Sequence, residues 1–280
     1  MDSYFDDSSM LRRVHRETAV AISGPRALFM QAAHPVAFEG FFAHTGALDT
    51  PYERLRRTAQ VMDTIAFGSR SDADRATRRV RAIHRRVRGE LRQPAGRFPV
   101  GTAFAADDPD LLLWVLATLV DSALVVYEHY VRSVSAAERD AYWQDYRVIG
   151  RLFGLEDEHM PRDIHGFDGY MRQMLAGPDL YVTRSARELA LRIVLRPPVP
   201  LAHRPVLKVV NFITVGLLPA RLRRQYGLSW NPACALMLRG GAAYARRVLI
   251  PLAPERLRFV ASARAGCCTR TSRCGVHDRY

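Results

Sequence analysis

Hydrophobic residues recur at spacings of three and four along most of the chain, and the two-residue alternation of surface strands is almost absent. Apolar patterns over 110–132 and 135–153 predict two long core helices. The pattern as a whole therefore predicts an all-α protein. Further helices are expected over 9–23, 26–45, 49–68, 71–89, 163–175, 185–195, 206–224 and 232–247.

Glycine and proline mark where these helices begin, end or break. Gly24-Pro25 is expected to end the first helix. His34-Pro35 is expected to interrupt the second, because proline disfavours a helical conformation in the residue before it. Pro51 suits a first helical turn, and Gly68 is expected to end the helix that Pro51 begins.

The length of 280 residues and the hydrophobic content of 48% suit one large domain, and no internal repeat is visible. We expect a disordered N-terminus over 1–8, a folded domain over 9–250 and an irregular tail over 251–280. The tail contains cysteines but no Cys-x-x-Cys pair, so a zinc site is not indicated. The acidic N-terminus lacks the basic-then-apolar pattern of a signal peptide, and we therefore expect a cytoplasmic protein.

The chain is strongly basic, with a formal net charge of +13. A positive charge of this size is typical of proteins that bind nucleic acid or anionic membranes. Lys208, however, is the single lysine among 41 basic residues, and such a bias is explained more simply by codon usage than by selection for phosphate contacts. We therefore expect no nucleic acid partner.

Two apolar segments resemble membrane spans. The segment 111–130 carries Asp121 at its middle, which opposes insertion by about 2.5 to 3.5 kcal/mol. The segment 209–220 is too short to span a bilayer. Both are expected to be buried core helices, which leaves only peripheral membrane contact open.

A single histidine, His84, lies within the arginine-rich stretch "RRVRAIHRRVRGE". On a helix, His84 falls within about 60° of Val80 and shares an apolar stripe with Ile83 and Val87, while the arginines spread over the other sides. This pattern predicts an inward histidine rather than a nucleic-acid-binding arm. Such a histidine is more often a core residue than a ligand.

The preceding helix places Arg54 and Thr58 on one stripe with Val61 and Ile65. An arginine that faces the core requires an anionic partner, because it cannot be deprotonated. That partner is either a buried carboxylate such as Asp121 or an acidic cofactor. A haem would combine both features, since its iron takes an axial histidine and its propionates pair with arginine.

Five segments in order resemble a family of haem-dependent oxygenases that contains the bacterial rubber oxygenases (latex-clearing proteins) and the MpaB-type oxygenases of fungal meroterpenoid biosynthesis. The resemblance extends over roughly 9–247. The segments are "GPRALFMQAAHPVAFEGFFAH", "ERLRRTAQVMDTIAFGS", "RAIHRRVRG", "DPDLLLWVLATLVDSALVVYEHY" and "GLLPARLRRQYGLSW".

The resemblance implies a single all-α, globin-like multi-helix domain that holds a b-type haem. By motif, His84 corresponds to the axial ligand, and Arg54 and Thr58 to an Arg-x-x-x-Thr pair needed for haem binding. A lysine that can occupy the distal position in rubber oxygenases is replaced by Arg57, whose guanidinium is a poor metal ligand; hydrogen bonding to O₂ is its expected role. Glu39 lies near the position of the glutamate that serves those enzymes as catalytic base.

Two further polar residues have alternative interpretations. His34, ahead of Pro35, either bonds backbone carbonyls freed by the helix break or lines the haem site. Asp121, within an apolar helix, must be paired or protonated. It could orient His84 through the second ring nitrogen, or form a salt bridge with Arg54.

The sequence therefore predicts a haem b-dependent oxygenase that uses O₂ on a hydrophobic small molecule or polymer, such as an isoprenoid or another unsaturated compound. The alternative is a non-catalytic helical protein that binds haem or an apolar ligand. A third hypothesis, a basic module for nucleic acid or anionic membranes, predicts salt-dependent binding and no chromophore.

Overall fold

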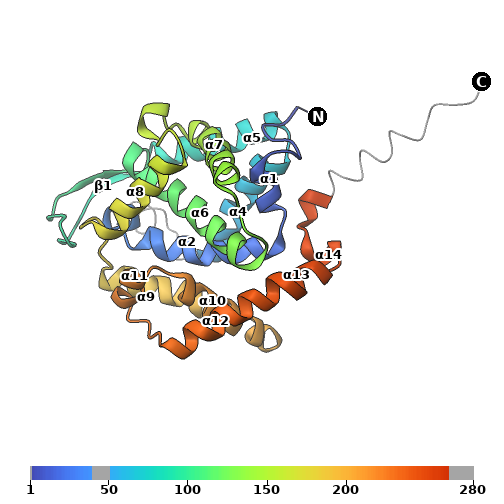
Figure 1. The fold of residues 1–280 in the computed structure, drawn as a ribbon. Helices are drawn as coiled ribbons and strands as arrows, with labels where there is room; N and C mark the ends of the chain where they lie inside the picture. Colours follow the sequence, from blue (N-terminus) through green and yellow to red (C-terminus); the bar gives the residue numbers. More distant parts are fainter. Residues whose placement is uncertain (1, 40–50, 265–280) are drawn as a thin grey trace, which may run out of the picture.

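The computed structural model describes residues 2–39 and 51–264, and the side chains of 51–55 are not among those described. Helices α1 to α14 and several short 3₁₀ and π turns form nearly all of its regular structure, which confirms the all-α prediction. The globin-like arrangement stays a prediction. Figure 1 shows an upper group of helices around α6 and a lower layer built by the C-terminal helices.

Helix α6 (Pro109–Tyr130) is the central helix of the upper group (Figure 1). Asp108 caps it by accepting hydrogen bonds from the backbone of Asp110 and Leu111, and Pro109 occupies the first turn. By length and composition α6 could cross a membrane, but 72% of its most apolar window is buried inside the protein. Its apolar side chains on all sides are those of a core helix.

Several helices pack on α6 or on its neighbours. Helix α2 (Ser23–Ala32) lies along α6, and α7 (Ala136–Phe153) packs on α6, on α5 (Arg70–His84) and on α1 (Met10–His15). Helix α8 (Ile164–Ala176) packs on α7, and the short α3 (Pro35–Phe38) follows α2. The large buried rings of this core include Trp114, Trp143 and Tyr142.

Helices α4 (Pro51–Phe67) and α5 (Arg70–His84) form an antiparallel helical hairpin. Only Gly68 and Ser69 separate them, and the Ser69 hydroxyl caps α5 by accepting from the backbone of Asp72. Helix α5 ends at His84, five residues before the predicted end at Gly89. The chain then continues into strand β1.

A small antiparallel sheet was not expected from the sequence. Strands β1 (Arg88–Glu90) and β2 (Ala103–Ala105) pair with Arg88 opposite Ala105. Three-residue strands are too short to show alternation, and their pairing depends on the intervening turns. Gly101, at φ +80°, supplies one of the left-handed conformations that these turns need.

The lower layer in Figure 1 consists of α9 (Arg184–Ala190), α10 (Arg204–Leu217), α11 (Ala220–Gln225) and α12 (Pro232–Tyr244). Helix α12 continues through a π turn (Ala245–Leu249) into α13 (Ile250–Leu252). A second, smaller core joins the layer to α6. The members of this core are Val126, Tyr130, Leu217, Leu238 and Ala242.

Several predicted boundaries were wrong for one reason: proline begins helices here. Gly24-Pro25 lies in the first turn of α2 instead of ending the first helix, which is split into α1 and a 3₁₀ turn over Thr18–Ile22. The helix expected over 206–224 is two helices, because α10 stops before Leu218-Pro219.

Both ends of the described chain are anchored, contrary to the expected disorder of 1–8 and irregularity of the tail. Phe5 is 3% exposed in the core, and the Tyr4 hydroxyl donates to Asp74 at 2.6 Å. Helix α14 (Glu255–Arg258) brings Arg258 onto Glu17, which is 1% exposed, through Nε–Oε2 and Nη2–Oε1 contacts of 3.0 and 2.9 Å. The tail beyond 264 lies outside the described residues.

Candidate functional site

The predicted haem-binding residues belong to two consecutive helices, α4 and α5. His84 is the last residue of α5, and Arg54 lies near the start of α4. The short turn at Gly68-Ser69 joins the two helices, so Arg54 and His84 both lie at the ends far from the turn along the chain, and Thr58 lies one helical turn closer to it.

His84 lies at the centre of the inward face of α5. This face is marked by Ala73 and Thr77, both buried, and His84 continues it at helical spacing. The His84 side chain is half-buried, and its Nδ1 atom is shielded from solvent. Ile83, expected on the same apolar stripe as His84, is 51% exposed.

Helix α4 changes character along its length. Its C-terminal half packs on the core through Ile65 and Ala66, and the Ala66 carbonyl accepts from Arg12 Nε at 2.8 Å. From 56 to 60, by contrast, every side chain is exposed, including Arg57 and Thr58. The side chain of Arg54 lies outside the described part of the chain. All sides of α4 are therefore exposed over 56–60, and Thr58, expected on an inward stripe with Val61 and Ile65, is exposed.

Asp121 pairs with Arg26, a residue that the sequence analysis did not single out. Arg26 Nη1 donates to Asp121 Oδ2 at 2.6 Å and to Ser122 Oγ at 2.8 Å, while its Nε donates to the Leu217 carbonyl at 2.9 Å. Asp121 was expected to orient His84 or to pair with Arg54. In the structure, Asp121 instead belongs to a set of polar contacts that join α2, α6 and α10.

His34 caps a helix. Its backbone lies between α2 and α3, and its Nδ1 accepts from the Ala37 N–H at 3.3 Å. The expected backbone bond thus exists, but it is made to an amide rather than to a carbonyl, since Pro35 begins the next helix and leaves its first amides unpaired. Burial lowers the pKa of His34 to about 4, so the ring is neutral and able to accept this bond.

Glu39 lies at a separate groove of about 500 Å³. The described residues that line it belong to α3, the loop after β1 and the start of α9, and include Pro35, Arg92 and Tyr181. His84, Arg57 and Thr58 are not among these lining residues. The role of Glu39 as catalytic base stays a prediction.

Two further polar groups in the core were missed. Trp114 is completely buried, and its Nε1 has no hydrogen-bond acceptor in the part of the chain that the structure describes. His15 Nε2 lies 3.0 Å from Tyr142 Oη and 2.9 Å from Tyr146 Oη. The spacing of the two tyrosines, one helical turn apart, was the available signal for this cluster.

Comparison with known proteins adds the family. The uncharacterized proteins Rv2237 of Mycobacterium tuberculosis and Mb2261 of Mycobacterium bovis are each 28% identical to this chain over 184 residues, which is 65% of this chain and 69% of theirs. No solved structure matches the chain. The model of the family described as "ER-bound oxygenase mpaB/B'/Rubber oxygenase, catalytic domain" matches residues 12–247, a span that includes both helices of the hairpin. The chain therefore belongs to this family of oxygenase catalytic domains, which supports an oxygenase role.

Proposed function

We propose that the protein is a haem b-dependent oxygenase that uses O₂ on a hydrophobic substrate, such as an isoprenoid or another unsaturated compound. The observation that supports the proposal is the position of His84 at the end of α5 and of Arg54 and Thr58 in the N-terminal half of α4, the helix that a short turn joins to α5. Family membership independently supports the oxygenase role.

The donor set at this end fits a haem. The half-buried His84 would offer a ring nitrogen to the haem iron, Arg54 a permanent charge to a propionate, and Thr58 a hydroxyl. The open α4 surface from 56 to 60 provides a helix face that a large planar group could cover. A single histidine, arginine and threonine would be a poor set for zinc or calcium, which take four or more protein ligands or oxygen-rich shells.

Each side chain has one role in this proposal. His84 would coordinate, Arg54 and Thr58 would hold the propionates, and Arg57 would donate hydrogen bonds toward an oxygen atom without coordinating, because its guanidinium stays protonated. The bound haem would supply the iron centre for O₂ activation. Apolar residues of α4 such as Val61 would help to exclude water from the site.

The first test is spectroscopic. The full chain reconstituted with haem b should show a Soret band that His84→Ala abolishes or shifts, because the axial ligand is lost. Arg54→Ala or Thr58→Ala should weaken haem binding by about 10- to 100-fold, as loss of supporting contacts does at metal sites. His165→Ala, on the exposed surface of α8, is the matched control. An unchanged Soret band in His84→Ala would refute the axial assignment.

The second test concerns turnover. Oxygen consumption is measured with the reconstituted protein and a panel of unsaturated hydrophobic compounds, with the haem-free protein as control. We expect oxygen consumption that depends on both haem and substrate. Haem binding at His84 without consumption on any compound would establish the non-catalytic carrier instead.

A further inference from the structure

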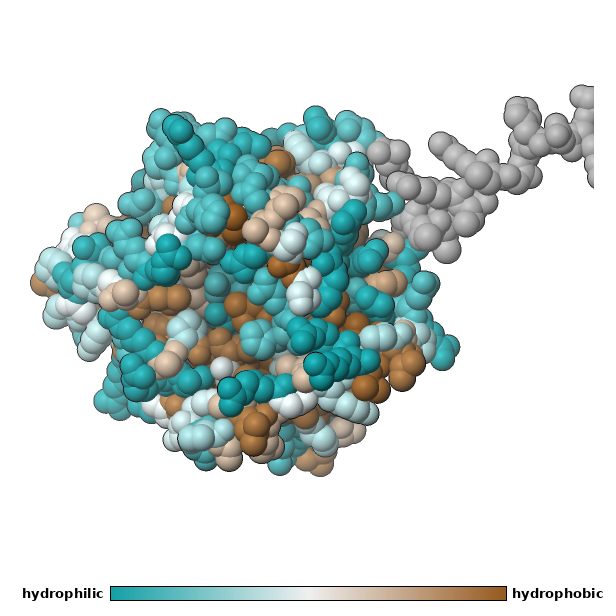
Figure 2. Space-filling model, in the orientation of Figure 1, coloured by the Kyte–Doolittle hydropathy of each residue, from teal (hydrophilic) through white to brown (hydrophobic). Residues whose placement is uncertain are grey.

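Most of the well-exposed large hydrophobic side chains in the described part of the chain lie in its C-terminal third. Nine of the twelve well-exposed large hydrophobic residues in the described part of the chain lie within 201–257. They are Leu201, Val206, Val209, Leu236, Met237, Tyr244, Leu249, Leu252 and Leu257. On the face shown in Figure 2, apolar patches interrupt the hydrophilic surface over the lower part of the molecule. A concentration of this kind marks an interaction surface.

Helix α12 is apolar on two opposite sides. Leu238 and Ala242 face the core, whereas Leu236 and Met237 are each 66% exposed and Tyr244 is 56% exposed. The core side accounts for how α12 packs on α6 and α10, but it leaves the outward side unexplained. A soluble amphipathic helix would carry polar residues there.

Helix α10 repeats this feature. Thr214 and Leu217 are buried against the rest of the protein, while Val206 and Val209 form an exposed stripe that the half-buried Ile213 continues. Helices α10 and α12 contact each other within the lower layer (Figure 1). The two outward apolar stripes therefore belong to one layer of the fold.

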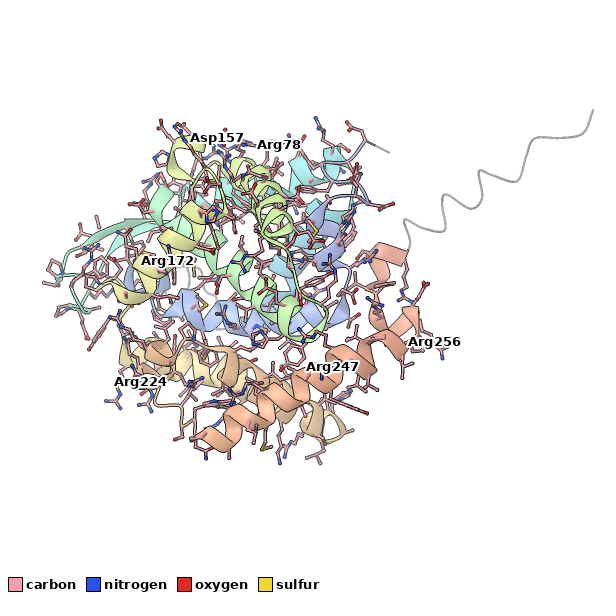
Figure 3. The ribbon with its side chains drawn as sticks, in the orientation of Figure 1. Arg78, Asp157, Arg172, Arg224, Arg247 and Arg256 are labelled. Atoms are coloured by element: carbon pink, nitrogen blue, oxygen red, sulfur yellow. The ribbon has the colours of Figure 1, made fainter. Side chains whose placement is uncertain are left out.

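The same part of the chain lacks acidic residues. One residue in ten of the whole chain is Asp or Glu, yet none occurs between Glu188 and Glu255. That interval contains ten basic residues, among them Lys208, Arg239 and Arg247. Figure 3 shows Arg247 and Arg256 along the edge of the lower layer, on the opposite side of the molecule from Arg78. The segment 189–254, which carries eight of these nine exposed apolar side chains, thus has only basic charged side chains.

We propose that the outward faces of α10 and of α12 to α13 dock on an anionic lipid bilayer. Leucine, methionine and tyrosine side chains would enter the headgroup region, and the arginines would contact lipid phosphates. The bilayer would then contact both the apolar side chains and the arginines of this surface. A nucleic acid would pair with the arginines but leave the aliphatic side chains in water, and a second copy of the chain would bring like charges together.

The test uses the full chain and lipid vesicles. The protein should sediment with vesicles of phosphatidylglycerol and phosphatidylcholine, bind pure phosphatidylcholine much more weakly, and dissociate as salt is raised. Leu236→Ser/Met237→Ser should lower the partition coefficient by about tenfold or more, since two apolar side chains no longer leave water. Arg247→Ser should lower it about fivefold.

Matched controls separate this surface from general hydrophobicity and charge. Val100→Ser removes an equally exposed apolar side chain from the loop between β1 and β2, and Arg78→Ser removes an exposed arginine from α5. Both should bind vesicles as the unmodified protein does. Circular dichroism and the melting temperature of each variant verify that it is folded.

Three results would overturn the proposal. Vesicle binding that is equal in Leu236→Ser/Met237→Ser and the unmodified protein would show that the apolar face is not used. Light scattering that shows a dimer, dissociated by the same double variant, would assign the face to a second copy of the chain. Binding to duplex DNA without binding to vesicles would assign the charge to nucleic acid. None of these readouts depends on haem.

Discussion

Arg26 connects three helices through one guanidinium group. Its donors reach Asp121 and Ser122 on α6 and the last carbonyl of α10, that of Leu217, while its own backbone belongs to α2. A buried guanidinium is tolerated only when its charge and its N–H groups are satisfied. Arg26 therefore determines how the lower layer meets the upper group.

Loss of the acidic partner should be costly. Asp121→Ala leaves the Arg26 charge buried, so the free energy of unfolding should fall by about 3 kcal/mol. Urea denaturation monitored by circular dichroism measures the change. Arg26→Met/Asp121→Leu, which removes both charges, should be less destabilising than Asp121→Ala alone; a larger loss in the double variant would contradict this account.

An exposed ion pair on α9 serves as the comparison for the buried Arg26–Asp121 pair. Arg184 and Glu188 lie one turn apart on the surface of α9, and Arg184→Ala should change the free energy of unfolding by no more than about 0.5 kcal/mol. Each substitution removes one ion pair, so the difference between the two changes in free energy of unfolding reflects the burial of Arg26.

The roles of single residues could be predicted only where they depend on local spacing. Helical periodicity placed His84 on the inward face of α5, and proline chemistry placed His34 at a helix break. The partner of Asp121 could not be predicted, because Arg26 is 95 positions away in sequence and meets it only through the packing of α2 on α6. His84 as a haem ligand stays a prediction.

Helix α5 shows why the predicted apolar stripe was slightly rotated from the real one. The prediction was centred on the largest hydrophobic residues, Val80 and Ile83, but the buried face contains Ala73 and Thr77. Small side chains let α5 approach α4 and α7 closely, so they define the contact although they contribute little to a hydrophobicity pattern. Arg81 then lies against Gly154, which ends α7.

Two glycines in the interior of α12 lower the stability of this helix. Gly240 and Gly241 are exposed in its interior, and a Cβ atom at either position would meet nothing within 4 Å. Gly240→Ala and Gly241→Ala should each raise the free energy of unfolding by up to about 1 kcal/mol, because alanine loses less conformational entropy in a helix. Thermal denaturation should show a higher melting temperature.

Gly216 in α10 is the matched control. A Cβ atom there would lie 2.5 Å from Cη2 of Trp230 and 2.7 Å from Cδ2 of Leu238. Gly216→Ala should therefore lower the melting temperature. If all three substitutions acted in the same direction, helix propensity would not be the cause at Gly240 and Gly241.

Two histidines, the half-buried His15 and the buried His34, link the fold as a whole to pH. His15 lies between Tyr142 and Tyr146 and joins α1 to α7, and His34 caps α3. Burial lowers the pKa of His15 and the pKa of His34 to about 4. Both rings are neutral in the folded protein at pH values where the unfolded chain protonates them.

The free energy of unfolding should consequently fall as the pH is lowered from about 6.5 towards 4. In this window the unfolded state binds more protons than the folded state, and each histidine contributes a loss of up to about 3 kcal/mol. Urea denaturation at pH 7 and pH 5 measures the slope. His15→Gln should reduce it, whereas His165→Gln, on the exposed surface of α8, should leave it unchanged.

The helical class of the fold was predictable in outline. Helical patterns identified most of the elements in the part of the chain that the structure describes. The outward apolar faces of α10 and α12 were not visible, because periodicity reports that a helix is apolar without telling which side its neighbours cover. The anchoring of Phe5 and α14 likewise depends on contacts between distant segments.

The contact between Glu17 and Arg258 also limits when the native surroundings of Glu17 can form during synthesis of the chain. The two residues are 241 positions apart, so at about 5 to 20 residues per second a ribosome makes Glu17 roughly ten to fifty seconds before Arg258. During that interval the Glu17 carboxylate has to stay hydrated, because the arginine that accompanies it into the interior has not been synthesised. The native environment of Glu17 can therefore close only after nearly the whole chain has left the ribosome.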